Sequence, residues 1–324
     1  MADAVRGRLL LPNASLRVED ATLDVPVTPA WGKLHRLEGL ATMSADFLSS
    51  IAAENSVNRS QPLPAAAHHR RSGVLLIGHG TRDATGHEQF LALAELLGRR
   101  LAPLPVQACV LELQRPTIAA AWELLARQGV QHIHAVPLLL FAAGHAKLDI
   151  PRTLADCQQA WPAVTWDQTR PLSRCPELLE LIVRRLDEVL AAELLPLERT
   201  ALVMVGRGSY DPCAQADMKV LAHCVGGKRP FRRVATAFYA MAEPTLPQVL
   251  DDLATDQSID AIVVQPHLLF AGAINQAIRD SVVQSQQRHP RCRHFGSQYL
   301  GPEPEIADAL VRRIAELPAS GQTI

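Results

Sequence analysis

A pattern that occurs twice, at a nearly constant spacing, limits the fold of this chain more than any other feature of its sequence. Gly78-His79-Gly80-Thr81-Arg82-Asp83 is followed 128 residues later by Gly206-Arg207-Gly208-Ser209-Tyr210-Asp211. Arg115-Pro116-Thr117-Ile118 matches Glu243-Pro244-Thr245-Leu246 at the same offset, and Pro137–Ala142 matches Pro266–Ala271 at an offset of 129. Three separate matches at nearly the same spacing indicate an internal duplication, which predicts two similar domains.

Each copy alternates short apolar runs, typical of strands, with longer amphipathic stretches, typical of helices. In the first copy we expect strands at Gly73–Ile77, Val106–Leu111, His132–Leu140 and Val164–Thr169, and helices at His87–Leu101, Ile118–Gln128 and Pro176–Leu194. In the second copy we expect strands at Ala201–Val205, Val234–Tyr239 and Ala261–Gln265. Continuously apolar strands that alternate with helices predict an α/β fold, with a parallel sheet in each domain and helices on both of its faces.

The chain of 324 residues is long enough for two such domains and an appendage. We expect the first repeat at 72–195, the second at 196–315 and a short tail at 316–324. Residues 1–71 differ in pattern from the rest, and we interpret them as an extension and linker whose role the sequence does not reveal.

Composition excludes several classes of partner. The net charge of −1 does not indicate binding to nucleic acid or to an anionic membrane. No apolar run approaches the 18 residues of a membrane span. The six cysteines include no CxxC pair, which argues against a cysteine-ligated zinc or an iron–sulfur cluster. The amino terminus lacks the apolar core of a secretory signal, so we expect a cytoplasmic protein.

Three residues with metal-binding side chains follow successive strands of the first repeat. His79 comes directly after the first strand, Glu112 after the second and His145 after the third, with 33 residues between successive members. Ligands of parallel α/β sheets bind beyond the carboxyl ends of the strands, so we expect all three side chains in one crevice. Two imidazoles and a carboxylate are good ligands for Co²⁺, Ni²⁺, Fe²⁺ or Zn²⁺.

Each of these residues alone has an ordinary alternative, such as a hydrogen-bonded structural histidine or a salt-bridged glutamate. Their convergence at three strand ends favours the metal site. The other histidines that fall within strand or helix patterns are interpreted as structural or surface residues: His87, His132, His134 and His223.

Together these motifs resemble the class II chelatases, the sirohydrochlorin cobaltochelatases and ferrochelatases. The resemblance covers about residues 72–315 and depends on the loop at 78–83, on Leu111-Glu112 with Pro116, and on Pro137–Phe141 with Gly144-His145. It implies a bilobal fold with a tetrapyrrole in the cleft between the lobes, and metal insertion without ATP or an organic cofactor. The paired metal-site histidines of that family match His79 and His145, and its acidic residue matches Glu112.

The resemblance implies a divalent metal ion as a substrate, with Co²⁺ favoured over Fe²⁺. An imidazole or Glu112 would accept the two protons that leave the pyrrole nitrogens. The carboxylates of a sirohydrochlorin-type tetrapyrrole would meet basic residues, and Arg82, Arg207 and Lys147 are the candidates. We expect a monomer or a homodimer.

The second repeat has lost the proposed ligands. Arg207 stands where the first repeat has His79, Ala240 where it has Glu112, and Ile274 or Asn275 where it has His145. We therefore expect the second repeat to form the opposite wall of the cleft. His267 stands where the first repeat has Leu138, and it is a candidate for a further ligand or proton acceptor there.

Other functions remain as alternatives. The ferrochelatase reaction is the main rival, and a tetrapyrrole or metal carrier without turnover is a rival of another class. A histidine phosphatase needs an arginine beside the nucleophilic histidine, where this chain has Gly78. A serine hydrolase is disfavoured because the sequence has no G-x-S-x-G motif.

Overall fold

A computed structural model describes residues 71–142, 148–173 and 175–318 of the chain. The extension expected at the amino terminus and most of the expected tail lie outside these residues, and the domain boundaries stay predictions. Among the described helices, none combines the length and the apolar character that crossing a membrane requires.

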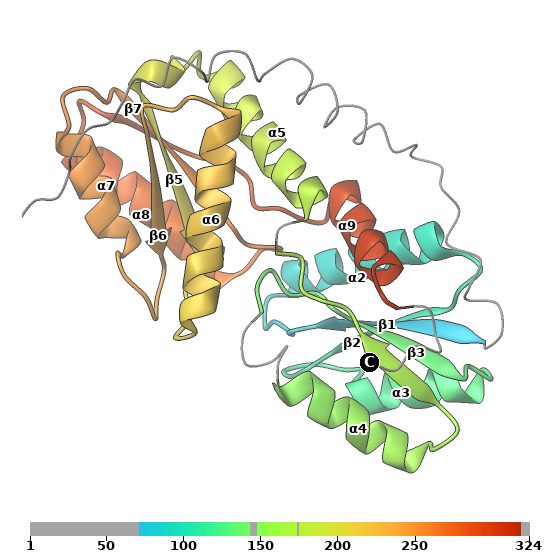
Figure 1. The fold of residues 1–324 in the computed structure, drawn as a ribbon. Coiled ribbons are helices and arrows are strands. Elements are labelled where there is room, and N and C mark those ends of the chain that lie inside the picture. Colours follow the sequence, from blue (N-terminus) through green and yellow to red (C-terminus); the bar gives the residue numbers. More distant parts are fainter. Residues whose placement is uncertain (1–70, 143–147, 174, 319–324) are drawn as a thin grey trace, which may run out of the picture. The chain divides into compact units, whose positions relative to one another are not determined.

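The first lobe contains a parallel sheet of four strands. β1 (Ser72–Gly78), β2 (Val106–Val110), β3 (His132–Pro137) and β4 (Thr165–Gln168) lie in the order β2-β1-β3-β4 (Figure 1). Leu76 of β1 is in register with Ala108 of β2 and Val136 of β3. The four strands that the sequence predicts here are therefore confirmed, and β1 is buried after Ser72 because helices cover the sheet on both faces.

Alternating residues of β1 divide the apolar interior of this lobe. Leu75 and Ile77 pack with Trp122 and Leu154 on the face covered by α3 (Ile118–Arg127) and α4 (Ile150–Ala160). Val74 and Leu76 belong to the core on the other face, beside α2 (Ala84–Leu101). Sequence analysis had assigned no element to α4, although its buried residues Ile150, Leu154 and Cys157 follow a helical period.

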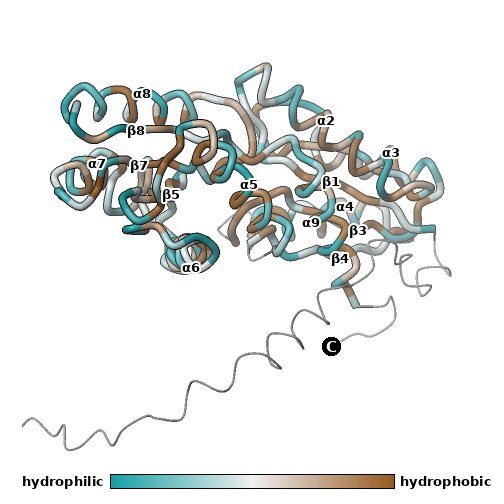
Figure 2. The backbone as a smooth tube through the Cα atoms, turned by 90° about the horizontal axis from the view of Figure 1, so that it is seen from above, coloured by the Kyte–Doolittle hydropathy of each residue, from teal (hydrophilic) through white to brown (hydrophobic). Residues whose placement is uncertain are grey.

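The second lobe repeats this arrangement, which confirms the predicted duplication. After a short 3-10 helix, η3 (Leu197–Arg199), the strands β5 (Thr200–Gly206), β6 (Arg233–Phe238), β7 (Ala261–Pro266) and β8 (Arg293–Gly296) lie parallel in the order β6-β5-β7-β8. Its helices are α6 (Pro212–Lys228), α7 (Leu246–Thr255) and α8 (Ala273–Arg288). In Figure 2 the buried strands β5 and β7 are mainly brown, whereas α8 is mainly teal.

The last helix of each repeat packs on the sheet of the other repeat. α5 (Pro176–Ala192) follows β4 in the sequence, but it contacts α6 and β7 of the second lobe. α9 (Pro304–Ala315) follows β8, but it contacts α2 and β3 of the first lobe (Figure 1). Since α5 and α9 also contact each other, this exchange joins the two lobes.

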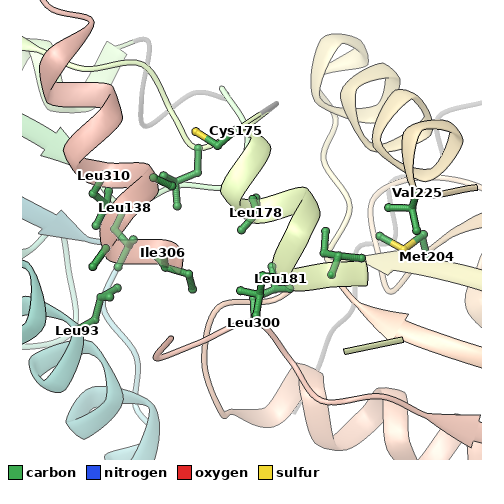
Figure 3. Packing of buried hydrophobic residues seen from close by; sticks show 14 of the residues in the cluster. Leu93, Leu138, Cys175, Leu178, Leu181, Met204, Val225, Leu300, Ile306 and Leu310 are labelled. Carbon is green, nitrogen blue, oxygen red and sulfur yellow. The ribbon is translucent and has the colours of Figure 1, made fainter. Parts of the chain in front are cut away.

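The exchanged helices share one apolar core with both sheets. Figure 3 shows part of this cluster, in which residues of α5 and α9 lie between residues of the first and second lobes. Leu181 on α5 and Leu310 on α9 are fully buried, as are Leu93 of the first lobe and Met204 of the second. Burial of a leucine-sized side chain contributes about 1.5–3 kcal/mol to the free energy of unfolding, so this core is the main connection between the lobes.

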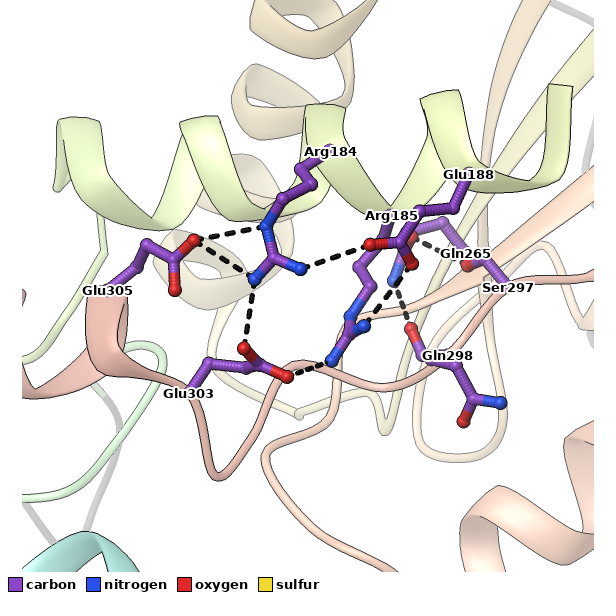
Figure 4. Close-up of polar contacts among 8 residues, drawn as sticks. All are labelled: Arg184, Arg185, Glu188, Gln265, Ser297, Gln298, Glu303 and Glu305. Carbon is purple, nitrogen blue, oxygen red and sulfur yellow. Dashed lines mark hydrogen bonds and ion pairs between the residues drawn. The ribbon is translucent and has the colours of Figure 1, made fainter. Parts of the chain in front are cut away.

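Ion pairs add to this connection at the surface. Arg184 of α5 donates to Glu303 and to Glu305, which precede or begin α9, at 2.9 Å in each case (Figure 4). Arg185 also pairs with Glu303. Because the Arg184 side chain is 40% exposed, each of its pairs contributes at most about 1 kcal/mol to stability, and their value lies in fixing how α5 meets the turn before α9.

Candidate functional site

The loop after β1 and the loop after β2 are joined through their backbones. The Glu112 amide donates to the His79 carbonyl at 3.2 Å, and the Leu111 amide donates to the Gly78 carbonyl at 2.9 Å. Gly80 directly follows His79 with a φ of +98°, and a Cβ there would lie 2.0 Å from the Glu112 carbonyl oxygen. Only glycine permits this approach, which holds His79 and Glu112 beside each other.

The side chains of His79 and Glu112 face one another at a distance that two metal ligands can have. His79 Nδ1 lies 3.6 Å from Glu112 Oε1, and the two side chains are 30% and 53% exposed. This distance is too long for a hydrogen bond. It is close to the roughly 3.0–3.4 Å that separates two donors bound to one ion at about 2.1 Å. The structure therefore brings these two predicted ligands together.

Two of the predicted site residues lie outside the described part of the chain. His145 and Lys147 belong to the segment 143–147, so the third metal ligand and one of the basic residues stay predictions.

The remaining residues of the loop after β1 start helix α2. The Thr81 hydroxyl accepts a hydrogen bond from the Asp83 amide at 3.1 Å, and the Asp83 carboxylate accepts one from the Gly86 amide at 2.7 Å. Asp83 is thus the residue that caps the helix. Arg82, between these two, is exposed and carries no part of this capping.

A pocket of about 870 Å³ lies between the two lobes at the carboxyl ends of their sheets. His79 and Arg82 line it from the first lobe, and Arg207 and His267 line it from the second. The volume is within the range of about 300–1,000 Å³ of small-molecule sites. Among the described residues, Glu112 is not part of the lining, although the adjacent Leu113 and Gln114 are.

His267 is a buried histidine on the wall of the second lobe. It follows β7, is 2% exposed, and its ring centroid lies 5.0 Å from that of Phe141 in the first lobe. Neither ring nitrogen has a hydrogen-bond partner among the described residues. Burial lowers the pKa of His267 to about 3, so the imidazole is neutral at physiological pH. A buried polar group without a partner is costly, and a ligand in the pocket can supply that partner.

A bridge near the pocket that sequence analysis missed ties α2 to the second lobe. The Gln89 side chain accepts from the Ala271 amide at 2.9 Å and donates to the Tyr299 hydroxyl at 2.7 Å. Phe90 packs edge-on against Phe270, with ring centroids 6.4 Å apart. A glutamine on a predicted helix gives no signal of a partner 182 residues away, which is why the sequence could not reveal this contact.

Sequence analysis also missed Asp149 and Tyr210, which line the pocket. Asp149 is the residue before α4. An Asp followed by Ile150 and Pro151 is a helix-start signal that would have placed it near the end of β3. Tyr210 lies in the second copy of the loop motif, where the first copy has Arg82.

Comparison with known proteins gives a family and a fold. The CbiX family profile matches this chain twice, at residues 73–189 and 201–317. The sirohydrochlorin ferrochelatase of Bacillus subtilis (strain 168) is 30% identical over 253 residues, which cover 78% of this chain and 94% of that protein. The sirohydrochlorin cobaltochelatase of Priestia megaterium is 27% identical over 248 residues, which cover 76% of this chain and 80% of that protein.

A solved structure has the same architecture. SirB from Bacillus subtilis, determined with Fe³⁺, superposes with a TM-score of 0.69 at 28% sequence identity, covering 76% of this chain and 95% of that chain. The likeness spans both lobes and supports the predicted chelatase-like fold.

Proposed function

Because the chain belongs to the CbiX family, we propose that it is a sirohydrochlorin chelatase that inserts Co²⁺ into the tetrapyrrole and releases two protons. The observation that carries this proposal is the pair of His79 and Glu112, whose side chains lie 3.6 Å apart beside the glycine turn, with His79 on the wall of the pocket between the lobes. The names of the two relatives support the same reaction class. The reaction uses neither ATP nor an organic cofactor.

His145 is proposed as the third ligand. Its counterparts in the second repeat are Ile274 or Asn275, and both of these line the pocket from the start of α8. The duplication therefore supports a position of His145 at the same pocket, opposite the second lobe. Two imidazoles and one carboxylate would leave positions on the ion open for pyrrole nitrogens.

The residues of the first lobe would perform three tasks in the reaction. His79, His145 and Glu112 replace water ligands of the incoming Co²⁺. They then give the ion up as pyrrole nitrogens replace them in turn. Two N–H protons leave the macrocycle during this exchange, and an imidazole released from the metal or the Glu112 carboxylate accepts them. The charge balances because the dication replaces two protons.

The other predicted residues would hold the tetrapyrrole. Its carboxylates meet the guanidinium groups of Arg82 and Arg207 from opposite walls of the pocket, and the ammonium group of Lys147 adds to them. His267 supplies a neutral imidazole from the second wall, as a hydrogen-bond partner or ligand, because its low pKa prevents it from acting as a base near neutrality. In this proposal residues 72–195 are the catalytic repeat and 196–315 the degenerate one, in a cytoplasmic monomer or homodimer.

The preference for Co²⁺ over Fe²⁺ rests on the family resemblance. The donor set of His79, Glu112 and His145 suits both ions and does not choose between them. The second candidate is the ferrochelatase reaction, because the Bacillus subtilis relative carries that name. Rates of metal insertion measured with each ion, under anaerobic conditions, separate the two.

The direct test combines purified protein, sirohydrochlorin and Co²⁺, and follows the absorption change of the macrocycle. We expect a rate well above the uncatalysed reaction, and we expect His145→Ala to abolish it with an unchanged circular dichroism spectrum. His223→Ala is the matched control, since that histidine is exposed on α6. A rate equal to the uncatalysed one would leave only a carrier of metal or tetrapyrrole, and full activity of His145→Ala would exclude the ligand set.

A further inference from the structure

Two histidines and an aspartate lie together at the edge of the first sheet, away from the pocket. His132 and His134 are on β3, and Asp167 is in register with His134 on the edge strand β4. Ile133 and Ala135 of β3 belong to the core under α3 and α4. Because side chains alternate along a strand, the two imidazoles lie on the opposite face.

Asp167 lies within hydrogen-bond distance of both imidazoles, which is close to the spacing of ligands around one ion. His132 Nε2 lies 3.0 Å from Asp167 Oδ2, and His134 Nδ1 lies 2.8 Å from Asp167 Oδ1. One donor atom from each of the three residues lies within 4.8 Å of the others. Donors that bind one ion at about 2.1 Å are roughly 3.0–3.4 Å apart, so an ion can enter after small movements of the side chains.

The surroundings of His132 favour a cation between its ring and the carboxylate. His132 Nδ1 lies 2.8 Å from the Thr165 hydroxyl, which is also 3.3 Å from the Gln131 carbonyl oxygen. In the tautomer in which that hydroxyl donates to Gln131 and accepts from Nδ1–H, the Nε2 lone pair points at Asp167 and can bind a cation. An outer hydrogen-bond partner of this kind is typical of histidines that bind metals.

The three side chains are partly open to solvent. The side chains of His132, His134 and Asp167 are 9%, 12% and 22% exposed. An ion can therefore reach the cluster from the sheet edge, and water can complete its coordination.

This cluster is separate from the pocket between the lobes. His132 is the first residue of β3 and is in register with Ser72, the first residue of β1, whereas His79 follows the far end of β1. At about 3.3 Å per residue, the seven residues from Ser72 to His79 place the two groups on the order of 20 Å apart along the strand.

We propose that His132, His134 and Asp167 form a second site for a divalent first-row transition metal such as Co²⁺, Ni²⁺ or Zn²⁺. A set of two imidazoles and one carboxylate, with water in the remaining positions, is a common donor set for these ions. Sequence analysis interpreted both histidines as structural or surface residues. The signal it passed over is the His-x-His spacing on a strand, which puts both rings on one face.

The test measures Co²⁺ binding to the full-length chain by equilibrium dialysis and by its visible d–d absorption, in a His79→Ala/Glu112→Ala parent that lacks two ligands of the first lobe. We expect the parent to bind one Co²⁺ that depends on this cluster. Asp167→Asn and His134→Gln, each added to the parent, should weaken that binding at least tenfold. The matched control is His289→Gln, because His289 also pairs with an aspartate, Asp251, at 3.0 Å, but without a second imidazole.

Binding that is the same in the parent, Asp167→Asn and His134→Gln would overturn the site. A second readout needs no further variant: X-ray absorption at the cobalt edge of the loaded parent should show two imidazoles in the first coordination shell, and fewer than two would also overturn it. Neither result depends on the proposed function. That function is measured by metal insertion into sirohydrochlorin, whereas the second metal site is measured by metal binding in a parent that lacks His79 and Glu112.

Discussion

The loops that follow the first strands of the two lobes have the same backbone and different side chains. Gly80 and Gly208 have φ values of +98° and +93°, and a Cβ on either would lie within 2.0 Å of a carbonyl oxygen, that of Glu112 or of Ala240. The Glu112 amide donates to His79, and the Ala240 amide donates to Arg207. The turn therefore depends on glycine and on backbone hydrogen bonds, so the side chains at positions 79 and 207 are free to differ in chemistry.

The difference teaches how a duplicated scaffold can divide its tasks. The first lobe keeps an imidazole and a carboxylate beside each other, as metal capture needs. The second lobe has a guanidinium group at Arg207 and a neutral, buried imidazole at His267. Arginine stays protonated and cannot bind a metal ion, but it suits a substrate carboxylate. We infer that the first lobe alone captures the ion, whereas both lobes hold the macrocycle.

The largest effect expected from this division is on turnover. His79→Ala should lower kcat/KM for Co²⁺ insertion by about 100-fold or more, because a proposed metal ligand is lost. Arg207→His, the reciprocal change in the second lobe, should lower it by less than tenfold. Initial rates from the absorption of the macrocycle measure both. Equal losses in the two variants would contradict the division of tasks.

The shared turn should respond in the same way in both lobes. Gly80→Ala and Gly208→Ala each add a Cβ against a carbonyl oxygen in a left-handed backbone, and each should lower the free energy of unfolding by about 3 kcal/mol. Urea denaturation measures this loss. Only Gly80→Ala should also reduce kcat more than stability explains, since it displaces Glu112. A Gly208→Ala protein as stable as the wild type would show that the second turn is not held as the first is.

The sequence predicted the number of lobes, because a duplication repeats both the glycine-containing motifs and the apolar strands. It did not predict the exchange of α5 and α9. The apolar residues of α5, such as Leu178 and Leu181, would suit either sheet, and adjacency in the sequence favours the wrong one. The choice depends on the core that both helices share with the two lobes, which no local pattern records.

The candidate site also has features that the sequence could predict and features that it could not. The approach of His79 to Glu112 follows from neighbouring parallel strands, whose ends meet at one edge of a sheet, and it could be predicted. The burial of His267 could not, because the ring that lies beside it, Phe141, comes from the other lobe. Its position in the sequence, at the end of a strand, was equally compatible with an exposed ligand.

The next effect in size concerns His267 and its counterpart Leu138. The pKa of His267 is about 3 in the folded chain and near 6.5 when unfolded. The unfolded state therefore binds more protons between these values, and the folded state loses stability as the pH falls below about 6.5. At pH 5 this loss amounts to about 2 kcal/mol. His267→Leu, which installs the residue of the first lobe, should remove this part of the pH dependence.

Urea unfolding of the wild type and of His267→Leu at pH 7 and pH 5 measures the difference. His223→Leu is the control, since this histidine is exposed on α6. If the free energy of unfolding of the two variants changes equally between pH 7 and pH 5, His267 is not held neutral by burial.

The smallest expected effect concerns Arg207, the charged side chain that the second lobe has where the first lobe has His79. Arg207 is exposed at the pocket, so its pairing with a substrate carboxylate contributes at most about 1 kcal/mol. Arg207→Ala should therefore raise the KM for sirohydrochlorin up to about fivefold and leave kcat unchanged, whereas Arg207→Lys should keep most of the affinity. Because salt screens exposed charges, 1 M NaCl should bring the KM of the wild type toward that of Arg207→Ala. A KM that does not change would mean that Arg207 is a solvated residue, and that the second lobe contributes to the pocket only through its apolar wall and His267.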